Sequence, residues 1–159
     1  GMKDQYLLAY IQPVFIDLDM NTVEPAIGAH RMDKVYAWKS MLDMGIHTSG
    51  GSDAPVVSFD AMENIYFAVT RKNISGQPQE GWIPSEKMSV DEAVKLFTKN
   101  AAYASYTEDE NGTIEVGKNA DFVVLEKNIY EIDPDEIKAT KVDMTVLGGE
   151  IVYEREVEE

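Results

Sequence analysis

The sequence predicts an α/β unit followed by a smaller segment made mostly of β-strands. Up to about residue 107, short apolar runs rich in β-forming residues alternate with stretches whose apolar residues recur at helical spacing. Beyond that point, two β-forming runs flank Gly148-Gly149, a two-residue hairpin loop. The chain has 159 residues and an ordinary hydrophobic fraction of 44%, so it can build one domain with a core and a small appendage.

The first predicted elements are two short strands with a helix between them. Residues 6–11 form an apolar run of β-forming residues, so we expect a buried strand there. Residues 13–30 are expected to be irregular, because Pro and Gly interrupt them. Residues 31–44 carry apolar side chains at helical spacing, and Gly45 predicts the end of that helix. The second strand is expected at residues 46–49.

Two pairs of polar residues mark the starts of the next two helices. Asp60 and Glu63 have the spacing of a capping box, and the apolar face of a helix follows them. Ser89 and Glu92 form the clearest capping box of the sequence and precede the buried stripe of another helix. The stripes are Met62, Ile65, Tyr66 and Val69 in the first helix, and Val90, Ala93, Val94 and Phe97 in the second. Residues 73–87, rich in Gly, Pro and polar side chains, predict a loop.

After these helices the pattern changes towards strands. Residues 100–106 are expected to form a short helix, and Asn111-Gly112 is a turn signal. Asp133-Pro134 begins a short helical turn, because proline is tolerated at the first helical position. Residues 154–159 form a charged tail. The strands expected in this part are residues 121–126, 142–147 and 151–153.

Charge and composition argue against several classes of protein. The 14 basic and 29 acidic residues give a net charge of −15, which disfavours nucleic acids and anionic membranes because phosphate binding needs Lys and Arg. The sequence has no cysteine, which excludes disulfides and thiolate metal sites and fits a reducing, cytoplasmic compartment. No apolar run reaches the roughly 18 residues of a membrane span, and the first residues lack the apolar region of a signal peptide.

The run Gly-Gly-Ser-Asp-Ala-Pro-Val at residues 50–56 is the strongest candidate site. It follows a predicted strand and precedes a predicted helix, which places Asp53 at the C-terminal mouth of the strand. Barrel enzymes put catalytic groups at this position. A carboxylate held there can bind a metal ion or accept a proton from water. Gly, Ser, Asp and Pro are also the residues of ordinary turns, and taken alone the run is more typical of a turn.

Other candidate groups each have a structural interpretation and a functional one. His30 lies near a helix start, where a surface position is expected. His47 alternates with apolar neighbours in a strand that leads towards Asp53, so it is either part of a pocket wall or a ligand. Arg71-Lys72 is a possible anion contact, but a favourable charge at a helix C-terminus explains it equally well. The Trp82-Ile83-Pro84 stretch either covers a pocket or anchors its loop.

An ordered set of short motifs extends along nearly the whole chain. These are Gln12-Pro13, Gly28 and Arg31, residues 38–42 with Gly45, residues 51–56, Glu92-Ala93 with Phe97-Thr98 and residues 100–104, Gly-x-Ile-x-x-Gly-Lys-x-Ala-Asp from residue 112 with the strand to residue 125, and the hairpin of residues 142–153. In this order they resemble the C-terminal part of the metal-dependent amidohydrolase superfamily. The branch is amidohydrolase family 3, which contains YtcJ-like and exoenzyme-regulatory-protein-like enzymes.

The resemblance implies both a fold and a chemistry. Residues 1–107 would be the last strands and helices of a (β/α)8 TIM-type barrel, and residues 108–159 the C-terminal share of an accessory β-sandwich. In the family, the position of Asp53 ligates a divalent metal ion, usually zinc. The same residue acts there as general base towards the water that attacks an amide or related C–N bond.

The sequence departs from the family pattern in the metal ligands. The His-x-His motif, the mid-barrel carboxylated lysine and the two later histidines are absent, and we expect the chain to begin just past the strand that would carry the last of them. One carboxylate cannot hold a catalytic zinc ion, so the isolated chain is expected to bind no metal and to be inactive.

Two hypotheses for the function follow. The first is the C-terminal portion of a cytoplasmic amidohydrolase that acts on a small amide-like molecule, with Asp53 as metal ligand and general base. The second is a non-catalytic remnant or interaction module. A partial barrel exposes strand edges and apolar faces, which a homo-oligomer could cover.

Overall fold

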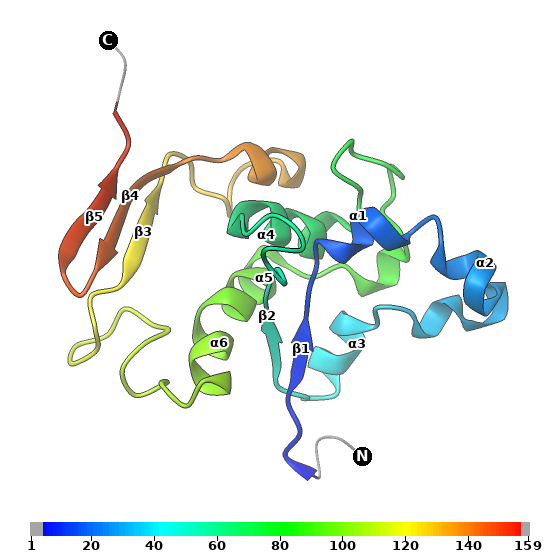
Figure 1. The fold of residues 1–159 in the computed structure, drawn as a ribbon, viewed down its shortest axis with the longest axis horizontal. Coiled ribbons are helices and arrows are strands. Elements are labelled where there is room, and N and C mark those ends of the chain that lie inside the picture. Colours follow the sequence, from blue (N-terminus) through cyan, green and yellow to red (C-terminus); the bar gives the residue numbers. More distant parts are fainter. Residues whose placement is uncertain (1–4, 157–159) are drawn as a thin grey trace.

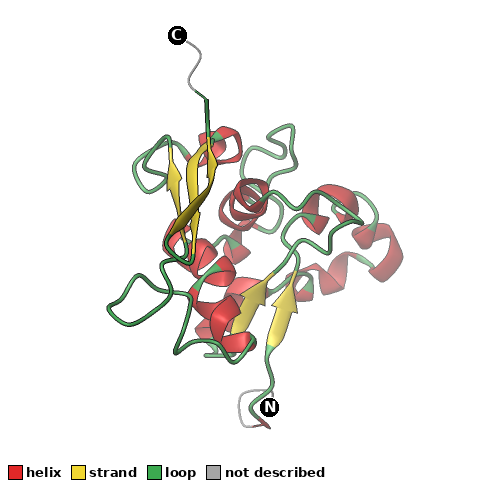
Figure 2. Ribbon diagram, turned by 60° about the vertical axis from the view of Figure 1, so that its left-hand side comes forward, coloured by secondary structure: helices red, strands yellow, loops and turns green. Residues whose placement is uncertain are grey.

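The computed structural model describes residues 5–156 and contains two separate sheets (Figures 1 and 2). The first sheet pairs β1 (Ala9–Ile11) with β2 (Thr48–Gly50) in parallel, with Tyr10 opposite Ser49. The second sheet is antiparallel and has three strands in the order β3-β4-β5. The helices that follow β2 lie between the two sheets, whereas those that connect β1 to β2 lie on the other side of β1 (Figure 1).

Both parallel strands are shorter than expected from the apolar runs. Ladder hydrogen bonds run from Ala9 N to His47 O (2.9 Å) and from Gly51 N to Ile11 O (2.9 Å), so pairing is confined to the residues between them. The expected strand at residues 6–11 is wrong in its first half, where Tyr6 has a positive φ of 55°. Strand pairing rather than apolar character therefore sets the strand limits.

The connection between β1 and β2 contains more helix than expected, in shorter pieces. Residues 13–30, expected to be irregular, contain all of α1 (Phe15–Asp19) and α2 (Val23–Ile27). The single helix expected at residues 31–44 is wrong, because the 3₁₀ helix η2 (Ala29–Lys34) and α3 (Trp38–Asp43) are separated by Tyr36, whose φ is +47°. The Tyr36 hydroxyl donates to the Asp19 carboxylate, a non-local contact that holds this break.

The end of α3 is the one that Gly45 predicts. Gly45 has a φ of 73°, a value that glycine adopts without strain. Its N–H donates to Leu42 O (2.8 Å), and the N–H of Ile46 donates to Met41 O (3.0 Å). These two bonds are the Schellman arrangement that satisfies the last carbonyls of a helix. The chain therefore turns here into β2.

Helix α4 (Ala61–Thr70) crosses the carboxyl ends of β1 and β2 and carries much of the core (Figure 1). The Asp60 side chain caps it by accepting from Met62 N (2.7 Å), but Asp60 N donates to Ser58 Oγ (3.2 Å) rather than to Glu63, so only half of the expected capping box is formed. The expectation of one apolar face is too narrow, because the helix is buried almost all round from Met62 to Thr70. Its second cover is the 3₁₀ helix η4 (Pro134–Ala139), which packs against α4. Distant residues are therefore needed to bury α4 completely.

Two helices follow the loop that contains the short 3₁₀ helix η3 (Pro84–Glu86). The capping box at the start of α5 (Val90–Phe97) is confirmed, because Ser89 Oγ accepts from Glu92 N (3.2 Å) and Ser89 N donates to the Glu92 carboxylate (2.8 Å). Helix α6 (Lys99–Ala104) follows, close to the short helix expected there. Local signals therefore predict this part well.

The antiparallel sheet consists of β3 (Phe122–Leu125), β4 (Val142–Leu147) and β5 (Glu150–Glu154). Gly148 and Gly149 have φ values of 59° and 84° and form the predicted hairpin turn. Both faces of the sheet are accessible to solvent, including large apolar side chains. The exposed apolar residues of the three strands are Phe122, Val123, Val124, Leu147, Ile151, Val152 and Tyr153. An isolated sheet of this kind needs a cover for stability.

The Gly-Lys-x-Ala-Asp segment stabilises the loop between α6 and β3 through its side-chain hydrogen bonds. Lys118 Nζ donates to Glu108 O (2.7 Å) and to Thr113 Oγ1 (2.6 Å), and Gly148 N donates to the Asp121 carboxylate (2.7 Å). These contacts give the signature a structural role. Across residues 5–156, no helix combines the length and the apolar character required to cross a bilayer.

Candidate functional site

Asp53 lies just beyond the carboxyl end of β2. The strand ends at Gly50, where a Cβ would lie 2.7 Å from Phe97 Cζ and 3.0 Å from Leu96 Cβ, so α5 packs directly on the backbone there. Asp53 itself has a φ of 64°, in the left-handed region that Asp tolerates better than most residues. This backbone conformation turns the Asp53 side chain away from the direction it would have in a continued strand. The predicted position of Asp53, past the carboxyl end of a strand, is confirmed, and its chemical role stays a prediction.

The Asp53 carboxylate is exposed and not engaged by the rest of the described chain. Its backbone oxygen accepts from Val56 N (3.0 Å), and Ser52 Oγ accepts from Ala54 N (3.3 Å), so the turn is stabilised without the carboxylate. Among residues 5–156, no hydrogen bond or ion pair to this carboxylate is formed, and a Cβ on Gly51 would meet nothing within 4 Å. The carboxylate is therefore available to a metal ion or a water molecule.

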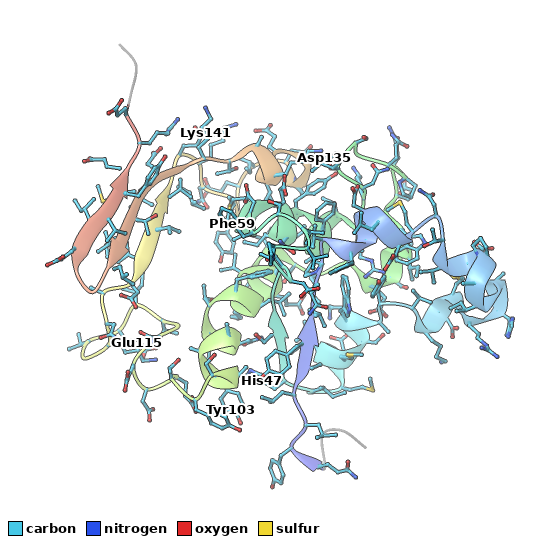
Figure 3. The ribbon with its side chains drawn as sticks, in the orientation of Figure 1. His47, Phe59, Tyr103, Glu115, Asp135 and Lys141 are labelled. Atoms are coloured by element: carbon cyan, nitrogen blue, oxygen red, sulfur yellow. The ribbon has the colours of Figure 1, made fainter. Side chains whose placement is uncertain are left out.

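His47 lies at the opposite end of β2 from Asp53. A strand advances about 3.3 Å per residue, so the three residues of β2 separate the two side chains by about 10 Å or more. The His47 ring stacks on Tyr103, with ring centroids 4.1 Å apart, as both side chains approach each other in Figure 3. Its Nε2 donates to Asn100 O (3.0 Å), and Asn100 Nδ2 donates to Thr48 O (2.9 Å). His47 thus joins β2 to α6. Of the two interpretations of His47, part of a wall or a ligand, these contacts favour the first.

His30 is exposed on η2, as expected for a surface residue. Within residues 5–156 no three or more His, Cys, Asp or Glu side chains come together in a way that could hold a metal ion. Asp53 can supply one ligand, and the described part of the chain does not complete a site around it.

Arg71, a possible anion contact by sequence, is fully buried at the C-cap of α4. Its Nε donates to Trp82 O (2.9 Å) and its Nη1 to Tyr36 O (3.0 Å). The guanidinium carbon lies 5.0 Å from the Trp38 ring centroid and 5.5 Å from that of Trp82. Burial lowers the pKa of Arg71 to about 10, while the Glu86 carboxylate opposes the shift. Arg71 therefore anchors the Trp82 loop.

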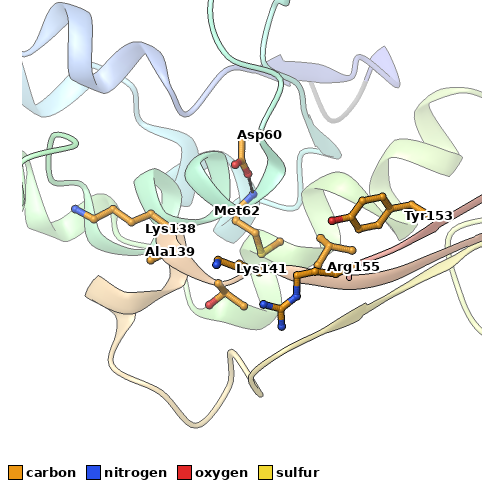
Figure 4. A pocket seen from close by; sticks show the side chains of 9 residues that line it. Asp60, Met62, Lys138, Ala139, Lys141, Tyr153 and Arg155 are labelled. Carbon is orange, nitrogen blue, oxygen red and sulfur yellow. Dashed lines mark hydrogen bonds between the residues drawn. The ribbon is translucent and has the colours of Figure 1, made fainter. Parts of the chain in front are cut away.

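A pocket of about 400 Å³ lies between the start of α4, η4 and the β4–β5 hairpin (Figure 4). Two of its three cations are engaged: Lys138 Nζ donates to Ile74 O (2.6 Å), and Arg155 Nε donates to the Asp143 carboxylate (2.8 Å). The third, Lys141, is exposed and bonds to Glu126 through its backbone N–H (3.1 Å). Asp60, on its rim, is occupied by the cap of α4. These contacts give Lys138, Arg155 and Asp60 structural roles.

Sequence reasoning missed two buried polar groups. Glu86 is almost fully buried and binds Ser40, with its carboxylate accepting from Ser40 N (3.0 Å) and from the hydroxyl. Asn64 is buried inside α4. The only sequence signal for Asn64 is a polar residue between two apolar positions of a helix.

Comparison with known proteins connects this arrangement to a family. The sequence profile of the amidohydrolase family matches residues 2–153. The chain is 38% identical over 145 residues to the putative amidohydrolase YtcJ of Bacillus subtilis (strain 168), covering 91% of this chain and 27% of that protein. It is 35% identical over 122 residues to the N-substituted formamide deformylase of Arthrobacter pascens, covering 77% of this chain and 22% of that protein.

Solved structures agree on the fold. An uncharacterized metal-dependent hydrolase from Pyrococcus horikoshii OT3 superposes with a TM-score of 0.73 at 21% identity, over 83% of this chain and 26% of that one. The chain thus spans about a quarter of the length of the relatives it matches. The match over nearly the whole sequence shows that the chain belongs to the amidohydrolase family.

Proposed function

We propose that the chain is the C-terminal portion of a metal-dependent amidohydrolase that hydrolyses C–N bonds in small amide-like molecules. The observation that carries this proposal is the exposed, unengaged carboxylate of Asp53 just past the carboxyl end of a parallel strand. Catalytic groups of (β/α)8 barrels lie at this end of the strands. The N-substituted formamide deformylase among the relatives supports a C–N bond as the target.

In this proposal residues 1–107 are the last part of a (β/α)8 barrel and residues 108–159 are the C-terminal share of a β-sandwich. The parallel β1–β2 pair with its helices supports the first assignment, and the antiparallel sheet with two accessible faces supports the second. The proposed boundary near residue 108 lies in the loop between α6 and β3, where Lys118 Nζ donates to Glu108 O. A cytoplasmic location, supported by the absence of cysteine, completes the proposal, together with the absence of nucleic-acid or membrane partners, which the net charge of −15 supports.

Asp53 has two roles in the proposed reaction. It supplies one oxygen ligand to a divalent metal ion, for which we propose zinc, and it accepts a proton from the attacking water as general base. A catalytic zinc ion needs about three protein ligands, and residues 5–156 bring no such group together. The other ligands must therefore come from outside the described residues, and the isolated chain is proposed to bind no metal and to be inactive.

The test compares the complete product of the reading frame with the isolated chain. We expect stoichiometric zinc and hydrolysis of N-substituted formamides in the complete protein, and neither in the chain. Asp53→Asn in the complete protein should lower kcat by at least about 100-fold, because a general base contributes about 10²–10⁴. Asp109→Asn, which changes another exposed carboxylate, is the matched control. If the isolated chain binds stoichiometric zinc and Asp53→Asn abolishes this binding, the proposal that the chain holds only part of the metal site is contradicted.

The exposed apolar sheet supports the second candidate, a self-associating non-catalytic module. A groove of about 710 Å³ between α5, α6 and β3 adds to this apolar surface, with Phe97, Ile114 and Phe122 in its lining. Multi-angle light scattering of the chain distinguishes the two candidates together with the metal analysis. A metal-free dimer and an inactive complete product support the module, whereas a monodisperse monomer argues against it.

A further inference from the structure

Asn64 is a buried amide in the middle of α4, with 1% of its surface exposed. Its Oδ1 accepts a hydrogen bond from Val14 N (3.1 Å), and its Nδ2 donates to Asp60 O (3.0 Å). A backbone N–H only donates and a carbonyl only accepts, so these two partners determine which way the amide faces. Asn is a poor helix former, and the residue is therefore explained by what it binds rather than by α4 itself.

The two partners of Asn64 belong to different strand exits. Val14 lies in the turn that directly follows β1, where its N–H is outside the β1–β2 ladder. Asp60 is the last residue of the segment 51–60, which follows β2 and carries Asp53. The Asn64 amide thus bridges the end of the Asp53 segment to the exit of the neighbouring strand.

The start of the same segment is tied to the same strand. Gly51 N donates to Ile11 O (2.9 Å), the last bond of the parallel ladder. Both ends of residues 51–60 are therefore held against the exit of β1, one by backbone and one by the Asn64 side chain. Between these two attachments the segment is largely exposed, and the bonds within it are short-range, such as Val56 N to Asp53 O.

We propose that Asn64 is a positioning residue for Asp53: its buried amide closes the 51–60 segment onto the exit of β1 and so holds the carboxylate in place. This inference rests on the proposed function of Asp53. Asp60 O also accepts from Asn64 N (3.3 Å), so the backbone of α4 still holds Asp60 when the amide is lost. Loss of the amide removes the side-chain bonds to Val14 N and Asp60 O and loosens this end of the segment, so the carboxylate samples more positions and binds a metal ion less tightly. Partners that orient metal ligands from outside typically contribute about 10–100-fold in affinity.

The test uses Asn64→Leu in the complete product of the reading frame, with Thr70→Val as the matched control. Thr70 is also buried in α4, but its hydroxyl donates within the helix, to Tyr66 O (2.8 Å). Hydrogen exchange of the 51–60 amides, read by mass spectrometry, and zinc affinity are measured for both variants. We expect about tenfold faster exchange and about tenfold weaker zinc binding for Asn64→Leu, and neither change for Thr70→Val.

A second variant keeps the inference testable if Asn64→Leu does not fold. Asn64→Asp retains an oxygen for Val14 N and cannot donate to Asp60 O, so exchange should rise in residues 51–60 while Val14 stays protected. Equal exchange and equal zinc affinity in the Asn64 variants and in Thr70→Val would overturn the inference.

Zinc affinity of Asp53→Asn separates this inference from the proposed function. Unchanged affinity in that variant refutes the metal-ligand role of Asp53 and with it the importance of its positioning. Lost affinity in Asp53→Asn combined with unchanged affinity in Asn64→Leu upholds the ligand role and refutes the positioning role of Asn64.

Discussion

Arg71→Met is expected to lower the free energy of unfolding by about 3 kcal/mol, because it removes two hydrogen bonds from the charged guanidinium to partly buried carbonyls. The guanidinium donates to Trp82 O (2.9 Å) and Tyr36 O (3.0 Å). Hydrogen bonds to charged groups contribute about 1.5–3 kcal/mol each, so the two together contribute about 3–6 kcal/mol. The contacts with the two indole rings add about 1–2 kcal/mol.

Two features reduce that loss. No carboxylate lies within ion-pair distance of Arg71 among the described residues, and its Nη2 is buried without a hydrogen-bond partner there. A methionine removes that unfavourable burial, which returns about 2–4 kcal/mol. The difference between these contributions leaves the expected loss of about 3 kcal/mol.

Urea titration followed by tryptophan fluorescence measures this directly, because the chain has two tryptophans and Arg71 lies against both. Arg71→Lys keeps the charge without the two-pronged donor geometry and should fall between wild type and Arg71→Met. Lys72→Met, which breaks the solvent-exposed pair with Asp135, should cost about 1 kcal/mol or less. A loss below about 1 kcal/mol for Arg71→Met would refute the anchoring role of the guanidinium.

Two further predictions concern the packing and capping of α5. Gly50→Ala should destabilise the protein by about 1–3 kcal/mol, because the new Cβ lies 2.7 Å from Phe97 Cζ, whereas Gly51→Ala should be nearly neutral; equal urea midpoints would contradict this. Ser89→Ala should cost about 1 kcal/mol at pH 7 by removing the cap. Burial raises the pKa of Glu92, but the hydrogen bonds from Ser89 and Lys39 outweigh it and hold this pKa below its usual value. The stabilisation is therefore present above the ordinary pKa of about 4.3 and is lost as the pH falls through the lowered pKa, so the cost of Ser89→Ala should shrink between pH 7 and pH 3 in urea titrations; a constant cost would rule out this linkage.

Features that depend on residues close together in the chain are predicted correctly by the sequence. The Ser89 capping box, the stop at Gly45 and the Gly148-Gly149 hairpin all appear in the structure at the expected places. Each depends on backbone geometry over a few residues, and the residue types reveal that geometry. The break at Tyr36 was not predicted, because the helical spacing of residues 31–44 is real and the break is held by Asp19, which is distant in sequence.

In the candidate site, too, the sequence predicts what depends on local residues, and the structure is needed for contacts between distant ones. The motif and its place after a predicted strand make Asp53 a candidate site residue from the sequence, and the order of the motifs indicates the family. The sequence alone could not decide between the two roles of His47. The structure places this residue at the far end of β2, in contact with α6.

By itself, the sequence determined the family, the succession of most elements and the position of Asp53 just past the end of β2, the carboxylate that we propose as a metal ligand. Only the tertiary structure decided which buried polar groups join the segment of Asp53 to the neighbouring strand. Asn64, Val14 and Asp60 meet because α4 lies across the exits of two parallel strands. Hydrogen bonds between segments distant in the chain leave no periodic pattern in the sequence, and a polar residue within an apolar helix does not reveal its partner.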